Sequence, residues 1–184
     1  MRAFELFTAR NSRHAVELLA EHGKSAKLLA GGTDLLVELK SSSEVPEAVI
    51  DISRAEDLKA IAVTDEGLSI GALVTHTAIM RSPLIRDMFP ALIDAAHTIG
   101  AVQTRNLGTL GGNLVTAVPS VDSGPTLVAL DALVTIAGPA GKRRMLLLDF
   151  FVGPRKTALK PGELLVEIVI PKENLSKPVH FLKM

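Results

Sequence analysis

The amino-acid sequence predicts an α+β fold with two lobes. Short strands and helices follow one another in a mixed order, and only the first part of the chain has a βαβ-like order. The chain has 184 residues, of which 47% are hydrophobic, so it is expected to fold around a real core rather than stay disordered. We therefore expect a small N-terminal lobe over residues 1–55 and a larger mixed α/β lobe over residues 56–184.

The N-terminal lobe is expected to alternate between strands and helices. Its predicted elements are a strand over residues 4–7, a helix over 12–21, a strand over 26–30, helical turns over 34–40 and a strand over 49–52. Ser12 is the predicted N-cap of the first helix, and Gly23 is expected to end it. Ala15, Leu18 and Leu19 recur at helical spacing, which indicates the buried face of this helix.

The larger lobe begins with a hairpin signal, because Thr64-Asp65-Glu66-Gly67 separates two apolar runs. Pro90 is expected to start a helix that Gly100 ends. The predicted elements are strands over residues 61–63 and 68–70, helices over 75–81, 90–99 and 125–130, and strands over 132–136, 143–147 and 164–170. The glycine-rich segment over residues 103–122 is expected to be a loop.

Composition excludes several functional classes. Lys+Arg and Asp+Glu are 20 each, whereas a nucleic-acid-binding protein is expected to carry a basic excess. There is no cysteine, so this chain provides no disulfide, no thiol nucleophile and no Cys-ligated cluster. The five histidines do not cluster in the sequence, and no metal site is expected. We find no secretory signal and no membrane-spanning run, so a cytoplasmic location is expected.

Two glycine-rich strings carry the strongest functional signal. The first is LLAGGTDLL, over residues 28–36, and the second is QTRNLGTLGGNLVTAVPSVD, over residues 103–122. Glycine lets the backbone approach a ligand closely, and consecutive N–H groups in such loops form anion sites. Each Gly-Gly pair alone is equally compatible with an ordinary turn. Together they indicate two loops that hold the two halves of one diphosphate-containing cofactor.

Two familiar phosphate-binding motifs are absent. Gly23-Lys24-Ser25 is similar to the end of a P-loop, but Leu18 stands where that motif requires its first glycine. Gly108, Gly111 and Gly112 lack the spacing of the dinucleotide-binding fingerprint G-x-G-x-x-G. Binding of ATP or NAD by these two devices is therefore not expected.

The two strings resemble the two flavin-binding segments of the FAD subunit of molybdenum hydroxylases, the xanthine dehydrogenase and carbon monoxide dehydrogenase family. The matching segments are LLAGGTDLLVELK and TRNLGTLGGNLVTAVPSVDSGPTLVALDA, and IGALVTHTAI and GELLVEIVIP also fit in order and spacing. The resemblance covers nearly the whole chain. It implies a two-lobed FAD-binding domain of the PCMH type, with FAD extended between the lobes.

The resemblance also implies which residues contact FAD. They are Leu28, Leu29, Ala30, Gly31, Gly32, Thr33, Asp34, Leu35, Ile99, Thr109, Gly111, Gly112, Asn113, Asp122, Leu165 and Lys183. The two glycine segments would supply donors to the diphosphate, which is a dianion that needs several of them. Asp122 would lie on the adenosine side and Lys183 close to the flavin. Ile99 stands where some relatives have an aromatic residue, so it would give apolar contact without stacking.

Some of these residues have simpler interpretations. Asp122 is also a candidate cap for the turn into Pro125, and Leu165 is also a strand residue facing the core. Lys183 is also a candidate for an unordered terminal lysine. His76, within IGALVTHTAI, either lines the cofactor or is a half-buried polar residue without a functional role.

The implied function is electron transfer. A molybdopterin subunit would oxidise the substrate, an iron–sulfur subunit would pass electrons to FAD, and FAD would deliver them to NAD, oxygen, a quinone or another small-molecule acceptor. No side chain is predicted to act as a catalytic acid, base or nucleophile. The family's subunits continue past FLKM, so we expect either a shortened chain or a naturally short member. The alternatives are a scaffold subunit that no longer uses FAD, or a reductase of the related cell-wall biosynthesis type.

Overall fold

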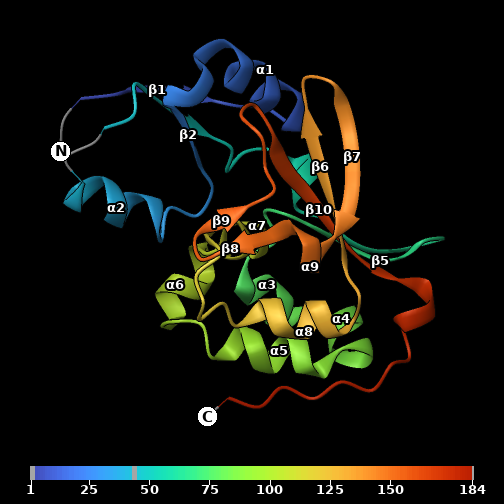
Figure 1. Ribbon diagram of the computed structural model, residues 1–184. Coiled ribbons are helices and arrows are strands. Elements are labelled where there is room, and N and C mark those ends of the chain that lie inside the picture. The colour runs from blue at the N-terminus through green and yellow to red at the C-terminus, as the bar shows by residue number, and fades with distance from the viewer. Residues whose placement is uncertain (1–2, 43–44, 184) are drawn as a thin grey trace.

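The computed structural model describes residues 3–42 and 45–183, and two main sheets organise it (Figure 1). One sheet lies near the N-terminus, and the other is built from later parts of the chain. Helices that pack mainly on one another lie below the second sheet in Figure 1. Met1, Arg2 and Met184, the outermost residues of the two expected lobes, lie outside the described residues. The α+β prediction is confirmed.

The first sheet is small and parallel, with the strand order β1-β3-β2. Its elements are β1 (Glu5–Thr8), α1 (Ser12–His22), the 3-10 turn η1 (Gly23–Ser25), β2 (Ala26–Leu29), α2 (Leu35–Ser41) and β3 (Ala48–Asp51). Parallel strands need a crossover connection, and α1 supplies it between β1 and β2. In the register, Ile50 of β3 lies between Phe7 and Leu28. Ile50 is fully buried because β3 is the central strand.

The N-cap of helix α1 lies one residue earlier than predicted. Its N-cap is Asn11, whose side chain accepts a hydrogen bond from the N–H of His14 at 2.9 Å, so Ser12 is the first helical residue and the prediction of a Ser12 cap is wrong. Asparagine and serine are equally good caps, so sequence alone does not decide between neighbours. Gly23 ends the helix as expected, at a φ of 60°.

The second sheet is antiparallel, with the strand order β4-β5-β10-β6-β7. Its strands are β4 (Ile61–Thr64), β5 (Gly67–Gly71), β6 (Leu133–Gly138), β7 (Gly141–Leu146) and β10 (Leu164–Pro171). All of them were expected within a few residues. Strand β10 is central, and its Ile168 lies between Ile70 and Val134 in the register. These apolar side chains belong to the larger of the two hydrophobic cores.

Helices pack against the apolar face of the second sheet and complete the larger core. They are α3 (His76–Arg81), α4 (Pro83–Met88), α5 (Pro90–His97), α6 (Val102–Leu107), α7 (Leu110–Thr116), α8 (Ser123–Ala129) and the single turn α9 (Leu147–Phe150). Short connecting elements complete the chain: η2 (Glu56–Leu58), β8 (Phe151–Gly153), β9 (Lys156–Thr157) and η3 (Lys172–Asn174). No helix in the described ranges is both long and apolar enough to cross a membrane.

The segment over residues 103–122 is largely helical, and the prediction of a loop there is wrong. Thr109 caps α7, because its hydroxyl oxygen accepts a hydrogen bond from the N–H of Gly112 at 3.0 Å. The N–H of Gly111 donates to the carbonyl oxygen of Ala72 at 2.9 Å. A Cβ on Gly111 would lie 2.7 Å from the Cβ of Ala72, so this helix requires a glycine for packing.

A second hydrophobic core joins the two sheets. Leu18 and Leu19 of α1 contribute to it together with Ile50 of the first sheet and Leu164 and Val166 of the second. Helix α1 therefore packs against both sheets and holds them in a fixed relative position. The domain boundary at residues 55 and 56 stays a prediction.

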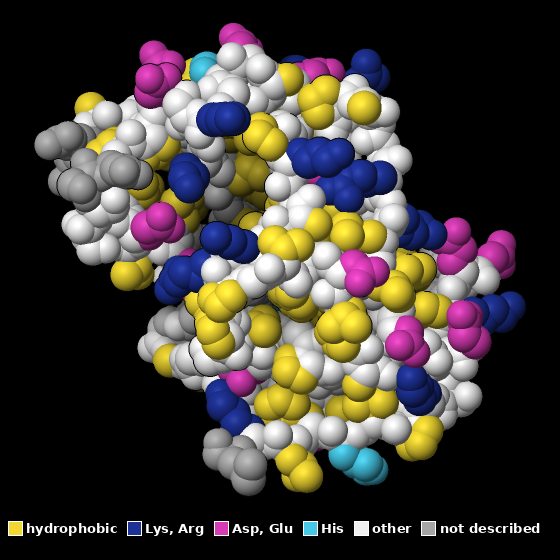
Figure 2. All heavy atoms as spheres, viewed as in Figure 1, with side chains coloured by type: hydrophobic (Ala, Val, Ile, Leu, Met, Phe, Trp, Pro, Cys, Tyr) yellow, Lys and Arg dark blue, Asp and Glu magenta, His cyan; other side chains and the backbone are white. Residues whose placement is uncertain are grey.

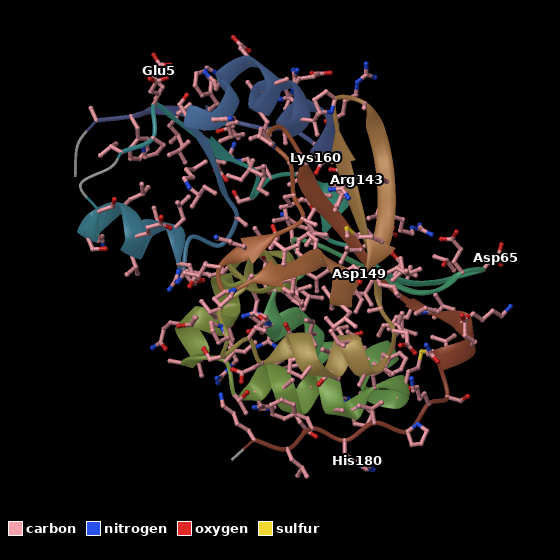
Figure 3. The ribbon with its side chains drawn as sticks, viewed as in Figure 1. Glu5, Asp65, Arg143, Asp149, Lys160 and His180 are labelled. Carbon is pink, nitrogen blue, oxygen red and sulfur yellow. The ribbon has the colours of Figure 1, made fainter. Side chains whose placement is uncertain are left out.

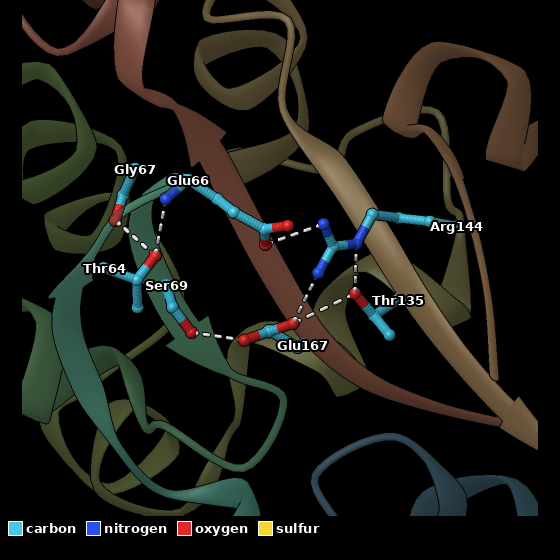
Figure 4. Close-up of polar contacts among 7 residues, drawn as sticks. All are labelled: Thr64, Glu66, Gly67, Ser69, Thr135, Arg144 and Glu167. Carbon is cyan, nitrogen blue, oxygen red and sulfur yellow. Dashed lines mark hydrogen bonds and ion pairs between the residues drawn. The ribbon is translucent and has the colours of Figure 1, made fainter.

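The side of the second sheet that faces away from the larger core carries a polar network (Figure 4). Glu167 on β10 accepts hydrogen bonds from the hydroxyl groups of Ser69 on β5 and Thr135 on β6. Arg144 on β7 donates to Thr135 and to Glu66. Each polar side chain within this half-buried surface thus has a partner, which stabilises the pairing of four neighbouring strands.

Candidate functional site

A cleft opens between the loop that follows β2 and the helices of the second lobe. Leu28 and residues 30–35 form one wall, and residues within 99–122 form most of the other. Figure 2 shows the surface hollowed beside the part of the molecule that carries α2, with Lys and Arg side chains around the opening. Lys27 and Arg155 line this outer part.

Most of the residues expected to contact a cofactor line this cleft. They are Leu28, Ala30, Gly31, Gly32, Thr33, Asp34, Leu35, Ile99, Thr109, Gly112, Asn113 and Asp122. The two glycine segments, about 75 residues apart in the sequence, are therefore brought together, as any shared ligand would require.

The first glycine segment presents a row of free donors. Within the described part of the chain, none of the five consecutive N–H groups from Gly31 to Leu35 donates a hydrogen bond to a protein atom. The hydrogen bonds of α2 begin only with the N–H of Leu36, which donates to the carbonyl oxygen of Gly32. Consecutive unpaired N–H groups in a concave loop are an anion-binding arrangement.

The two glycines of this segment have different roles. Gly32 has a φ of 73°, a left-handed conformation that glycine adopts without strain. Gly31 instead provides space, because a Cβ there would lie 1.8 Å from the carbonyl oxygen of Leu107 at the end of α6. The loop therefore approaches the opposite wall closely through backbone atoms.

The second glycine segment differs from what the sequence indicated. Its N–H groups are already used: that of Leu110 donates to Val74, that of Gly111 to Ala72 and that of Asn113 to Thr109. This wall instead presents polar side chains to the cleft, together with Gly112, which has no side chain to cover the backbone. Asn113 accepts a hydrogen bond from Ser123 at its Oδ1, which leaves its amide NH₂ group as a donor.

Four of the predicted residues lie off the wall of this cleft. Leu29 is the last residue of β2, and its side chain packs beside Gly32. Gly111 and Leu165 line an adjoining apolar pocket that shares Leu28 and Ala30 with the cleft. Leu165 is only 2% exposed, so it is at once a core residue and a pocket residue.

The fourth, Lys183, contacts the site through Asp122. Its Nζ lies 2.7 Å from Oδ1 of Asp122, whose side chain is 15% exposed. Asp122 occupies the N-cap position of α8 but caps no N–H group with its side chain. Because the two residues form an ion pair, they cannot lie at opposite ends of an extended cofactor in this conformation, as the sequence comparison had implied.

Two further residues shape the same wall: Arg105, which the sequence analysis did not single out, and His76, for which it left two interpretations open. The Arg105 guanidinium donates from Nη1 to three carbonyl oxygens of the turn after α5, those of His97, Ile99 and Gly100, at 2.9–3.2 Å. It therefore holds Ile99 in place. His76 lies in the cleft wall and is 2% exposed. An isolated arginine five residues after a turn gives no sequence signal for this role.

The fold and the cleft together define a class. A two-walled cleft with five free N–H groups fits a phosphate-containing cofactor, and its apolar margins fit ring systems. Its lining also includes the Asp122 carboxylate, the His76 imidazole and the Thr109 hydroxyl group. The class that these features define is a cofactor-binding domain.

The chain belongs to the family described as the FAD binding domain in molybdopterin dehydrogenase, which matches residues 2–173. It is 37% identical over 188 residues to the nicotinate dehydrogenase FAD-subunit of Eubacterium barkeri. This match covers 100% of this chain and 64% of that protein. It is 36% identical to the carbon monoxide dehydrogenase medium chain of Hydrogenophaga pseudoflava, over 91% of this chain and 58% of that protein. FAD is therefore the cofactor of this domain.

Solved structures agree with this assignment. Carbon monoxide dehydrogenase from Hydrogenophaga pseudoflava superposes with a TM-score of 0.89 at 35% identity, covering 93% of this chain and 60% of that chain. Quinoline 2-oxidoreductase from Pseudomonas putida 86 gives a TM-score of 0.89 at 30% identity, with the same coverage. UDP-N-acetylenolpyruvylglucosamine reductase from Thermus caldophilus, at 20% identity and a TM-score of 0.56, shares the fold alone. The chain spans about 60% of the length of its relatives.

Proposed function

We propose that this domain belongs to the flavoprotein component of a molybdenum hydroxylase-type dehydrogenase and passes electrons from an iron–sulfur subunit to a small-molecule acceptor. The names of its relatives, FAD-subunit and medium chain of dehydrogenases, support membership in a multi-subunit complex. When bound, FAD supplies the capacity to accept and release one or two electrons. A molybdopterin subunit would carry out substrate oxidation. A cytoplasmic location is part of this proposal.

The observation that carries the proposal is the row of free N–H groups from Gly31 to Leu35. The diphosphate of FAD is a dianion, and these donors are fixed by α2 and by the contact of Gly31 with Leu107. Donors held in place before binding lose little entropy on binding. We assign the diphosphate to this wall of the cleft.

On the opposite wall, side-chain donors take the role that N–H groups were expected to have. The Thr109 hydroxyl oxygen accepts from Gly112, so its O–H remains a donor. The amide NH₂ group of Asn113 is the second donor. Gly112 lines the cleft without a side chain, which leaves space for the ligand to approach the backbone of α7.

Apolar side chains are assigned to the ring systems of FAD. Leu28, Ala30 and Ile99 line the cleft, and Leu165 lines the adjoining pocket. No aromatic side chain lines either space within the described ranges. Apolar burial rather than aromatic stacking would therefore hold the rings.

Asp122 and Lys183 are assigned to the same end of the cofactor. A carboxylate accepts hydrogen bonds from ribose hydroxyl groups, and Asp122 lines the cleft. Lys183 orients that carboxylate through the 2.7 Å ion pair. A contact of Lys183 with the flavin would require this pair to break.

The experiment that tests the proposal is the visible absorption spectrum of the purified chain, followed by chromatography of the cofactor that heating releases. We expect flavin absorption bands and about one FAD per chain, as one cleft per chain implies. A colourless chain that also fails to bind added FAD would contradict the proposal and favour a scaffold role.

A further inference from the structure

His76 is a buried polar residue whose ring finds no partner in the protein. The residue is 2% exposed, and its Nδ1 is enclosed without a hydrogen-bond partner in the described structure. Its Nε2 makes no hydrogen bond to described atoms either, but it is not enclosed in this way. Buried polar groups without partners carry a free-energy cost and are rare in native proteins.

The backbone around His76 fixes the ring at the junction of the two cleft walls. The N–H of His76 donates to the carbonyl oxygen of Gly108 at 3.1 Å, and Thr75 caps α3. The position that a Cβ on Gly108 would occupy is 3.4 Å from Cδ2 of His76 and 3.6 Å from the hydroxyl oxygen of Thr33. The Cδ2 edge of the imidazole and the hydroxyl group of Thr33 therefore lie around the same point beside Gly108, and both residues line the cleft.

The surroundings of the ring keep it uncharged at neutral pH. The pKa of His76 is lowered from 6.5 to about 4, mainly by burial; the Asp122 carboxylate opposes this shift, and the Arg105 guanidinium adds to it. A neutral imidazole carries one donor and one acceptor. Neither group forms a hydrogen bond with a protein atom in the described residues.

We propose that His76 is a hydrogen-bonding residue of the FAD site, with Nε2 donating to an oxygen of the phosphate–ribityl part of the bound cofactor. This inference rests on the proposed binding of FAD in the cleft. It explains why a histidine occupies a position where an apolar residue of similar size would leave no unpaired polar atom. The hydrogen bond of Nε2 to the ligand then offsets the cost of burying the ring, although the enclosed Nδ1 stays without a partner.

Two variants separate this role from a structural one. In His76→Leu the unpaired polar atoms are removed, whereas His76→Gln retains an amide nitrogen near the position of Nε2. His180→Leu is the matched control, because His180 is exposed on the C-terminal segment, far from the cleft (Figure 3). Each apoprotein is titrated with FAD by flavin fluorescence, and its thermal unfolding is recorded without FAD.

We expect His76→Leu to weaken FAD binding by roughly tenfold or more, as the loss of one buried hydrogen bond implies. Its apoprotein should melt at or above the wild-type temperature. His76→Gln should recover part of the affinity, and His180→Leu should bind as wild type does. Affinity of His76→Leu within about twofold of wild type, or a loss of affinity that only follows a lowered melting temperature, would overturn the inference.

A spectroscopic measurement covers the case in which His76→Leu fails to fold. The ring nitrogens of ¹⁵N-labelled wild-type protein are observed by NMR before and after addition of FAD. We expect the Nε2 resonance of His76 to shift on binding, and an unchanged resonance in the FAD-bound protein would overturn the inference. Wild-type protein that binds no FAD would instead contradict the proposed function itself.

Discussion

Gly31 and Leu107 meet across the cleft with their backbones in contact. A Cβ on Gly31 would lie 1.8 Å from the carbonyl oxygen of Leu107 and 2.5 Å from its carbonyl carbon. Both neighbours are main-chain atoms, so no rotation of a side chain relieves such a clash. The position of the N–H-rich loop relative to the helical wall therefore depends on the absence of one methyl group.

The first prediction follows from this contact. Gly31→Ala should destabilise the apoprotein by about 1–3 kcal/mol, the usual cost of overpacking, because the loop and α6 must move apart. The movement should also weaken FAD binding. Urea unfolding and FAD titration measure the two effects.

Gly153→Ala is the matched control for this prediction. Gly153 has no atom within 4 Å of the position of a Cβ and does not adopt a positive φ. It should unfold and bind FAD as wild type does. A Gly31→Ala protein with wild-type stability would show that the two walls do not meet as described.

Local sequence patterns predicted the parts of the fold that local forces determine. The turn over residues 64–67 formed the expected hairpin, and Ala15, Leu18 and Leu19 are the buried residues of α1. The first glycine segment forms a loop that lines the cleft, and its contact with a ligand stays a prediction. In each case the pattern is set by turn chemistry or by hydrophobic spacing, which act over a few residues.

Features that depend on distant contacts were missed. Helix α7 contains Gly111 and Gly112, which disfavour a helix locally, but packing of Gly111 against Ala72 and the Thr109 cap outweigh that preference. The unpaired ring of His76 is visible only once α3 and the segment around Gly108 are placed together. The pairing of Asp122 with Lys183, 61 residues apart, likewise has no local signal.

The second prediction concerns the Arg143–Glu163 pair. Arg143 donates from Nε and Nη2 to the two carboxylate oxygens of Glu163, at 2.8 and 2.7 Å, and this contact ties β7 to the turn before β10. Figure 3 labels Arg143 and nearby Lys160, whose N–H also donates to Glu163. Arg143→Met should cost about 1–3 kcal/mol of unfolding free energy, because charged hydrogen bonds at a half-buried site are lost.

Lys142→Met, an exposed change on the same strand, should stay within about 0.5 kcal/mol of wild type. The Arg143 hydrogen bond lowers the pKa of Glu163, so its contribution is present above the ordinary pKa of a glutamate and is lost as the pH falls through the lowered value. Acid should therefore destabilise Arg143→Met less than wild type. Equal sensitivity to acid in the two proteins would contradict this account of the pair.

The third prediction is a pH dependence that arises from His76. Its pKa is about 4 in the folded protein and 6.5 in the unfolded chain, so between these values only the unfolded chain binds the proton. Stability of the apoprotein should therefore fall as the pH drops from 6.5 to 4, by up to about 3 kcal/mol from this residue. Asp122 and Arg105 are the charged groups that modulate the shift.

Urea unfolding of wild type and His76→Leu at a series of pH values isolates this contribution, because the carboxylates titrate alike in both proteins. The wild-type protein should lose more stability on acidification than the variant. Parallel curves for the two proteins would show that His76 is not held neutral by burial.

The central claim is that FAD lies in the cleft between the two glycine segments. The most direct test is titration of the apoprotein with FAD, with Gly112→Val and Gly153→Val compared with wild type under identical conditions. Gly112→Val places a branched side chain against the cleft, and only the Thr109 hydroxyl lies near the new Cβ, at 2.9 Å. We predict saturation near one FAD per chain for wild type and Gly153→Val, and affinity lowered by about tenfold or more for Gly112→Val with unchanged far-UV circular dichroism. Wild-type affinity in Gly112→Val would contradict this placement of the cofactor.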